Sequence, residues 1–132
     1  MMPTAVVDAS ALAAVVFQEP RFERVAAQLE GRSVVAPLLL QFELANVAVM
    51  KARRDPAQAP AILGALAVAL DDSTGIQWRA VNPTDVALLA CITGLTAYDA
   101  SYLWLAGSEE ADLVTLDEML MAAAATEADA LG

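Results

Sequence analysis

The chain has 132 residues, the length of one ordinary domain, and we expect a single domain over residues 1–132. One cysteine and no histidine exclude an internal disulfide, histidine-based catalytic triads and the usual zinc sites. The formal charge of −10 comes from seventeen acidic and seven basic side chains, so any chemistry must depend on carboxylates, hydroxyls, Arg and the single lysine, Lys51.

Hydrophobic residues make up 58% of the chain, and the mean hydropathy is +0.54. This is high for a monomer of this size and predicts a homodimer that covers apolar surface. The apolar runs are broken by Glu43 or are shorter than the roughly 20 residues that a membrane span needs, so we expect no membrane segment. The N-terminus has no basic leader and carries Asp8 within its apolar run, which predicts a cytoplasmic protein.

The N-terminal half alternates short β-branched runs with helix-forming segments. Gly31 is expected to end one helix, and Pro37 to begin the next. The expected elements are strand 4–8, helix 10–19, helix 21–30 after Pro20, strand 33–36, helix 38–54 and helix 55–72.

The C-terminal half continues the alternation. Its expected elements are a weak strand at 75–81, helix 82–94 ended by Gly94, helix 96–111, a clear strand at 112–117 and a final helix from 118 with an ambiguous tail. Strands separated by helices form βαβ units, and these predict a three-layer α/β/α sandwich with a mainly parallel central sheet. In such sheets ligands bind beyond the carboxyl ends of the strands.

Three aspartates lie where strands end or helices begin. Asp8 follows the first strand, Asp117 ends the last strand, and Asp99 lies in the first turn of its helix. Each has a purely structural alternative: Asp8 or Ser10 as a helix N-cap, Asp117 as the cap of the last helix, and Asp99 as part of a capping box that Thr96 opens. Taken alone, none of the three predicts a function.

Glu43 lies in the middle of a predicted helix, where capping does not explain a carboxylate. Its neighbours on the same helical face include Leu40 and Val47. A buried carboxylate is costly unless it is paired, hydrogen-bonded, neutralised or bound to a cation. Asn46, three residues further on, is a candidate for orienting it.

Taken together, the four acids predict a carboxylate cluster at the ligand-binding edge of the sheet. Oxygen ligands without sulfur or imidazole favour Mg²⁺ or Mn²⁺. Such an ion activates water and stabilises charge on a phosphodiester without any histidine. Hydrolysis of a phosphate ester is the reaction class that fits.

Four segments, VVDAS, FELANV, LTAYDASYLWLA and LVTLD, follow one another in this order over residues 4 to about 120. They resemble the signature segments of PIN-domain ribonucleases, specifically the VapC-type toxins of toxin–antitoxin pairs. The resemblance implies an acidic metal cluster of Asp8, Glu43, Asp99 and Asp117. It further implies that the hydroxyls of Ser10 and Thr115 orient these carboxylates or the attacking water.

The same resemblance implies a Mg²⁺- or Mn²⁺-dependent endoribonuclease that forms homodimers. A VapB-type antitoxin would hold it inactive through a C-terminal arm in the active-site groove. The charge of −10 departs from what RNA binding favours. Possible RNA contacts are Arg21, Arg24, Lys51, Arg53 and Arg54, with solvated helix-end charges as the alternative role for these side chains.

Two other functions remain open from the sequence. One is a catalytically inactive PIN-like module that only binds a partner. The other is an aspartate-dependent Mg²⁺ phosphatase or a receiver domain, although Ser10 stands where such a phosphatase needs a second aspartate and Lys51 is on a helix instead of a strand end. Tyr102 and Trp104 are predicted to serve in packing, the common role of aromatic side chains on an apolar helix.

Overall fold

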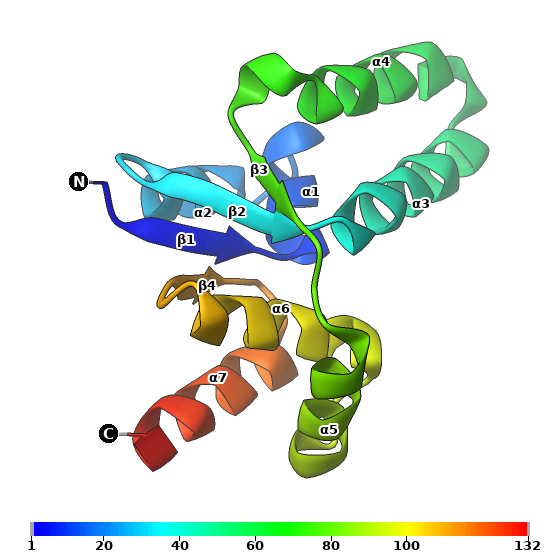
Figure 1. Cartoon of the computed structure of the whole chain (residues 1–132). Helices are drawn as coiled ribbons and strands as arrows, with labels where there is room; N and C mark the ends of the chain where they lie inside the picture. Colours follow the sequence, from blue (N-terminus) through cyan, green and yellow to red (C-terminus); the bar gives the residue numbers. More distant parts are fainter. Residues whose placement is uncertain (1, 132) are drawn as a thin grey trace.

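A computed structural model describes residues 2–131, with side chains described through residue 127. Its centre is a four-stranded sheet in the order β3-β2-β1-β4, in which every neighbouring pair is parallel (Figure 1). The strands are β1 (Thr4–Val7), β2 (Ser33–Pro37), β3 (Gln77–Arg79) and β4 (Asp112–Val114). The predicted parallel α/β architecture is confirmed.

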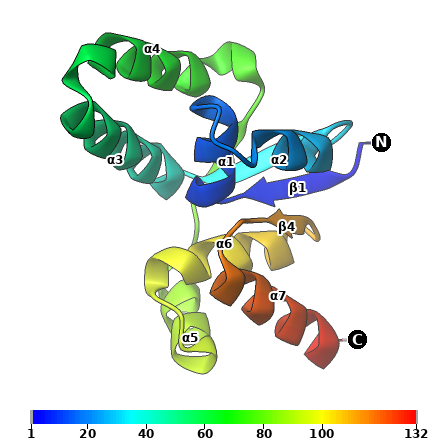
Figure 2. The same cartoon turned by 180° about the vertical axis from the view of Figure 1, so that it is seen from behind.

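Helices cover both faces of the sheet (Figures 1 and 2). They are α1 (Ala9–Val16), α2 (Phe22–Leu29), α3 (Leu39–Arg54), α4 (Ala59–Leu70), α5 (Pro83–Thr93), α6 (Ala97–Ser108) and α7 (Glu118–Leu131), with short 3₁₀ turns at Pro56–Gln58 and Asp72–Thr74. In Figure 2 α5, α6 and α7 lie below β1 and α1 and α2 lie above it, while α3 and α4 pack together as a helical hairpin.

The core forms where the central strand meets these helices. Ala5, Val6 and Val7 of β1 are fully buried, as expected for a parallel strand covered on both faces. Leu44 of α3 and Tyr102 of α6 belong to the same buried cluster. Burial of this continuous apolar run fixes the end of β1, and therefore the position of the residue that follows it.

Two predicted helix ends are confirmed. Gly31 and Gly94 follow α2 and α5 with φ angles of +73° and +77°, in the left-handed region that glycine adopts without a side-chain clash. Asn82 caps α5 by accepting hydrogen bonds from two backbone N–H groups, directly before Pro83 in the first turn.

Several predicted boundaries are wrong, among them the ends of α1 and α6, which lie at Val16 and Ser108, three residues before the predicted ends. Pro37 does not begin a helix: it is the last residue of β2, paired with Arg79, and α3 begins at Leu39. Proline is tolerated there because the pairing of β2 with β1 ends at Val35, so Pro37 pairs only with β3, and its missing N–H falls at the strand end. The last strand ends at Val114, three residues before the predicted end, because the next residues turn away to cap α7.

Among residues 2–131, no single helix is long and apolar enough to cross a bilayer. The helices Pro83–Thr93 and Ala97–Ser108 reach the length and hydropathy of a membrane span only when they are taken together, and they are bent by 106° relative to each other.

Candidate active site

The residues predicted to form a site follow the carboxyl ends of adjacent strands. Asp8 comes directly after β1, Thr115 and Asp117 come after β4, and Glu43 lies in α3, which follows β2. Because β1 pairs with both β2 and β4, these three strand ends are neighbours at one edge of the sheet. This is the edge at which parallel α/β sheets bind ligands.

Asp8 is held at both carboxylate oxygens. Its Oδ1 accepts hydrogen bonds from the Ser10 hydroxyl at 2.7 Å and from the Ala11 N–H at 3.0 Å, which makes Asp8 the N-cap of α1. Its Oδ2 accepts a hydrogen bond from the Thr115 hydroxyl. The side chain is only 5% exposed, so a buried and fixed carboxylate projects from the central strand end.

Ser10 and Thr115 connect the ends of β1 and β4. The Leu116 N–H donates to Ser10 Oγ and the Asp117 N–H donates to Thr115 Oγ1, both at 3.0 Å. Each hydroxyl therefore accepts from the β4 side while it donates its one proton to Asp8. Since both protons are used, the 3.4 Å approach between the two hydroxyl oxygens is a packing contact and not a further hydrogen bond.

Asp117 and Asp99 differ in how firmly their side chains are held. Asp117 Oδ1 accepts from the N–H groups of Met119 at 2.9 Å and Leu120 at 3.0 Å, and so caps α7. The N-terminus of α6 is capped by Thr96, whose hydroxyl accepts from the Asp99 N–H at 3.1 Å. From the residues that the structure describes, the Asp99 carboxylate accepts no hydrogen bond, which leaves it available to a ligand.

Glu43 has a partner that the sequence interpretation did not identify. The hydroxyl of Tyr102, a side chain 1% exposed, donates to Glu43 Oε1. Asn46 is exposed and its amide donates to Met50 Sδ at 3.8 Å, so in this structure it does not touch the carboxylate. Tyr102 does pack in the core, as predicted, but its position on α6, with Glu43 59 residues earlier on α3, gave no signal of this contact.

The electrostatics of the site link the four acids. Partial burial raises the pKa of Glu43, the Tyr102 hydrogen bond opposes that shift, and the negative charges of Asp99 and Asp8 add to it. Partial burial likewise raises the pKa of Asp99, with further contributions from the charges of Asp117 and Asp8. Burial and the adjacent Glu43 raise the pKa of the Tyr102 hydroxyl, so it stays protonated as a hydrogen-bond donor.

The donor chemistry fits a hard divalent cation, but the cluster is not a closed cage. Within residues 2–131, no group of three or more acidic, histidine or cysteine side chains is arranged to hold a metal ion as the structure stands. An ion at this edge would therefore be bound in part through water molecules, which is a common arrangement for Mg²⁺.

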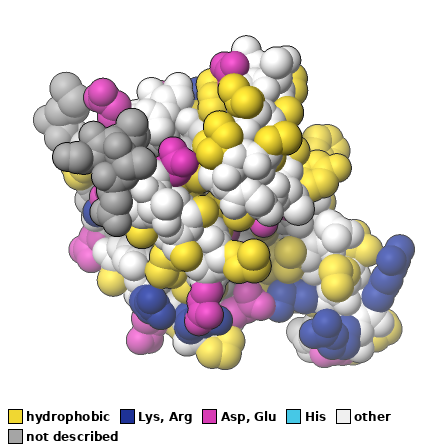
Figure 3. Space-filling model, turned by 90° about the horizontal axis from the view of Figure 1, so that it is seen from below, with side chains coloured by type: hydrophobic (Ala, Val, Ile, Leu, Met, Phe, Trp, Pro, Cys, Tyr) yellow, Lys and Arg dark blue, Asp and Glu magenta, His cyan; other side chains and the backbone are white. Residues whose placement is uncertain are grey.

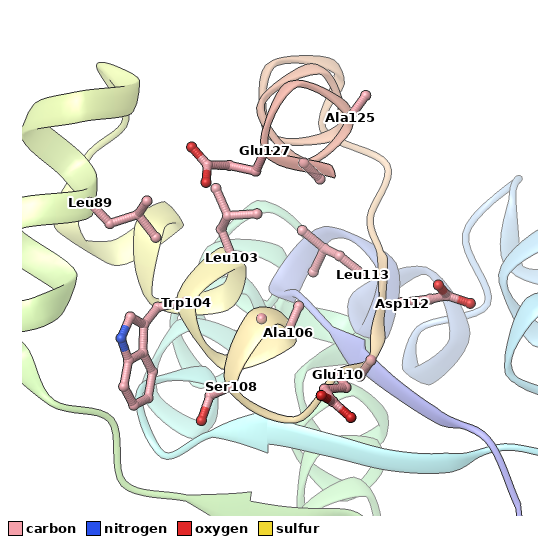
Figure 4. Close-up of a pocket in the computed structure, with 13 residues that line it drawn as sticks. Leu89, Leu103, Trp104, Ala106, Ser108, Glu110, Asp112, Leu113, Ala125 and Glu127 are labelled. Atoms are coloured by element: carbon pink, nitrogen blue, oxygen red, sulfur yellow. The ribbon is translucent and has the colours of Figure 1, made fainter. Parts of the chain in front are cut away.

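Two cavities of the structure lie away from the four acids. One, of about 840 Å³, lies between α5, α6, α7 and β4, where Leu103 and Leu113 point toward α7 (Figure 4). The other, of about 600 Å³, lies between the end of α1 and the α3–α4 hairpin and is lined in part by Lys51 and Arg54. None of the four acids lines either cavity, so the candidate site is an open carboxylate cluster and not a deep pocket.

The basic side chains are dispersed, and some are paired. Lys51 Nζ lies 2.9 Å from Glu19 Oε2, while Arg21, Arg24, Arg53 and Arg54 are exposed. Two further ion pairs join Arg32 to Asp112 at 2.7 Å and Arg79 to Glu109 at 3.1 Å. On the face in Figure 3, Lys and Arg side chains gather at the margin, and Asp and Glu side chains lie among and between them.

Replacing Glu43 with glutamine is expected to stabilise the metal-free protein. Glutamine removes the charge that burial and the neighbouring aspartates disfavour, and its carbonyl still accepts from Tyr102. In EDTA the melting temperature should rise, by roughly 3 °C or more for each kcal/mol gained. Glu30→Gln, at an exposed position beyond the end of α2, is the matched control and should have little effect. A lower melting temperature for Glu43→Gln would contradict the inference that the charge of Glu43 destabilises the metal-free protein.

The benefit of Glu43→Gln is expected to depend on pH. Because the pKa of Glu43 is raised in the folded state, folding disfavours its charged form, and the wild type regains this stability as pH falls through the folded pKa toward the ordinary value of 4.5. The difference in melting temperature between variant and wild type should therefore be largest at about pH 7.5 and smaller at about pH 5. A difference that is constant or grows on acidification would show that charge is not its cause.

A family model and two solved structures are similar to the chain. Residues 5–126 match the family model described as PIN domain. In fold, the chain is similar to PAE2754 from Pyrobaculum aerophilum, with a TM-score of 0.72, 27% identity and coverage of 99% of this chain and 98% of that one. It is also similar to VapC20 of Mycobacterium tuberculosis, a toxin that cleaves the sarcin–ricin loop, with a TM-score of 0.64, 16% identity and coverage of 90% and 94%. A search of curated proteins gives no match.

Proposed function

Because this chain belongs to the PIN domain family, whose members are generally nucleases, we propose that it is a Mg²⁺- or Mn²⁺-dependent endoribonuclease that hydrolyses RNA phosphodiester bonds. The observation that supports this best is the placement of four carboxylates from distant segments around one sheet edge, where the charges of Asp8, Asp99 and Asp117 raise the pKa of a neighbouring acid. Such a concentration of negative charge lowers the stability of the fold, and clusters of this kind are typical of functional sites.

In this proposal Asp8, Glu43, Asp99 and Asp117 hold the ion. The bound ion would lower the pKa of a water molecule and neutralise charge that develops on the phosphate. Asp8 is fixed by hydrogen bonds at both oxygens and provides the rigid part of the site. Asp99, which accepts no hydrogen bond from the described residues, provides an adjustable part.

Ser10 and Thr115 have a supporting role in this proposal. Each donates its proton to Asp8 and accepts a backbone N–H from the segment after β4. They thereby keep the Asp8 carboxylate oriented and hold the segment that carries Asp117 against the end of β1. Groups that orient ligand side chains in this way commonly affect metal affinity.

RNA contacts are proposed for the exposed arginines. Arg53 and Arg54 lie in the last turn of α3, and Arg21 and Arg24 lie at the start of α2 and within it. Lys51 is proposed as a weaker contributor, because Glu19 already neutralises it at 2.9 Å. With a formal charge of −10, binding should depend on these local groups and weaken steeply with salt.

We further propose that the chain is a VapC-like toxin that a VapB-type antitoxin neutralises, as its structural neighbour VapC20 is a toxin. A homodimer is proposed as well. Its support is exposed apolar surface on α3, α5 and α6, where Phe42 is 76%, Ile92 68% and Tyr98 63% exposed. A single domain over residues 1–132 and a cytoplasmic location stay predictions of the sequence.

One second candidate function has an observation in its favour. The absence of a ready-made metal-ligand group within residues 2–131 would suit a PIN-like module that binds a partner without cutting RNA. Membership of the PIN family gives no support to the phosphatase or receiver alternative.

The test of the proposed activity is RNA cleavage by the purified chain, freed of any antitoxin. We expect internal cuts in RNA that require Mg²⁺ or Mn²⁺, stop in excess EDTA and return when the ion is added back. Internal cutting that persists in EDTA would disprove metal dependence. If a panel of structured and single-stranded RNAs stays intact while the protein binds them or a partner, the binding module is the correct function.

A further inference from the structure

Tyr102 places a single polar atom at the end of a deeply buried side chain. The residue is 1% exposed and belongs to the hydrophobic core, yet its hydroxyl donates to Glu43 Oε1 on another helix. A phenylalanine would fill almost the same volume without burying a hydroxyl. Packing alone therefore does not account for a tyrosine at this position, whereas the hydrogen bond to Glu43 does.

The partner of this hydroxyl, Glu43, has a longer side chain than the three aspartates of the site. A glutamate side chain loses up to roughly 2 kcal/mol of conformational entropy when it is fixed. A tyrosine ring held in the core has few torsions of its own, so its hydroxyl is a rigid point of attachment. Asn46, the other candidate for orienting Glu43, is exposed and directed at Met50.

The contact fixes one oxygen of Glu43 and leaves the other. Tyr102 occupies Oε1, and within the described residues Oε2 has no hydrogen-bond donor. Asp8 and Asp99 are close enough for their charges to act on this carboxylate. The hydroxyl thus holds Glu43 in the acid cluster while one oxygen remains available.

We propose that Tyr102 is a positioning residue, which acts through Glu43 and holds its carboxylate where it can share a divalent cation with Asp8 and Asp99. This inference rests on the proposed metal-dependent function. It assigns a function-related role to a residue that packs in the core. A purely structural role for Tyr102 would instead affect the stability of the protein and leave its metal affinity unchanged.

The first test is calorimetric titration of Mn²⁺ into Tyr102→Phe, with melting temperatures measured in EDTA. Tyr98→Phe is the matched control, because Tyr98 lies on the same helix but is 63% exposed. We expect Tyr102→Phe to weaken Mn²⁺ binding by about 10-fold or more, as for other groups that orient ligands, and Tyr98→Phe to leave it unchanged. In a Glu43→Gln background, Tyr102→Phe should add little further loss, because the residue through which it acts is already changed.

The outcomes separate this inference from the function on which it rests. If the wild type binds Mn²⁺ and Tyr102→Phe binds it equally well, or if the two losses multiply in the double variant, the positioning role is wrong and the metal site stands. If the wild type binds no Mn²⁺, the metal site fails and the inference fails with it.

A second measurement needs no substitution at Tyr102. Protein labelled with fluorotyrosine contains only Tyr98 and Tyr102 as reporters, and Tyr98→Phe assigns their fluorine signals. Saturating Mg²⁺ should shift the signal of Tyr102, because its partner Glu43 changes charge environment, and should leave that of Tyr98 in place. A Tyr102 signal that does not move when Mg²⁺ binds would overturn the proposal.

Discussion

Asp99→Asn is expected to reduce RNA cleavage by about 10³-fold or more, because loss of a metal-stabilised transition state costs several kcal/mol and each 1.4 kcal/mol is a factor of ten. Asparagine is nearly the same size as aspartate and lacks only the charge that attracts a cation. The substitution therefore tests charge and not shape.

The fold should not suffer from Asp99→Asn. The side chain that caps α6 belongs to Thr96, and Asp99 takes part in that cap only through its backbone N–H. Burial and the neighbouring acids already raise the pKa of Asp99, so removal of its charge should leave the metal-free protein as stable as the wild type or more so. A loss of cleavage with an unchanged melting temperature would place Asp99 in the active site.

The control for this prediction is Asp85→Asn. Asp85 lies in the first turn of α5, is exposed, and resembles Asp99 in its position on a helix. Its replacement should leave cleavage within about threefold of the wild type, since surface substitutions away from a site have small effects. If Asp99→Asn retained activity comparable to that of Asp85→Asn, the carboxylate of Asp99 would have no part in catalysis.

Asp8→Ala is expected to abolish cleavage and also to destabilise the protein, by about 2–4 kcal/mol, because it removes a helix cap and leaves buried hydrogen-bond donors without their acceptor. The donors are the hydroxyls of Ser10 and Thr115 and the N–H of Ala11. The melting temperature should fall by roughly 3 °C or more for each kcal/mol lost. Thermal unfolding and cleavage of the same RNA measure the two effects separately.

Asp71→Ala is the control variant, because it removes an aspartate that caps a turn at an exposed position. Asp71 caps the turn Asp72–Thr74 by accepting the Ser73 N–H at 2.8 Å, and it is exposed. Its replacement should cost less stability than Asp8→Ala and leave cleavage unchanged. Should Asp8→Ala destabilise the protein no more than Asp71→Ala, the buried hydrogen-bond network around Asp8 would contribute less than its geometry indicates.

Much of the fold follows from local sequence signals. The apolar, β-branched run TAVVD predicts a strand, and the structure has one at Thr4–Val7, with Ala5–Val7 fully buried. Gly31 and Gly94 end their helices as predicted, since the left-handed backbone there strongly favours glycine. The end of β2 was mispredicted at Pro37 because proline suits both a first helical turn and a strand end, and only its pairing with Arg79 decides between them.

Some features of the candidate site cannot be predicted from the sequence. The alternatives of cap and ligand for Asp8 and Asp117 are not exclusive: both side chains do cap helices and both lie at the acidic edge. The Tyr102 contact to Glu43 joins residues 59 positions apart and is invisible to any local pattern. An aromatic residue on an apolar helix predicts packing, which is correct here, but it does not predict which acceptor its hydroxyl will bind.

The central claim is that the four carboxylates bind a divalent cation, and calorimetric titration of Mn²⁺ into the antitoxin-free protein tests it most directly. We predict saturable binding to the wild type and to Asp71→Asn, and a loss or strong weakening of binding in Asp99→Asn. Equal binding to all three proteins would place the ion elsewhere. The absence of binding to the wild type at millimolar Mn²⁺ would contradict the claim and favour a module that binds without cutting RNA.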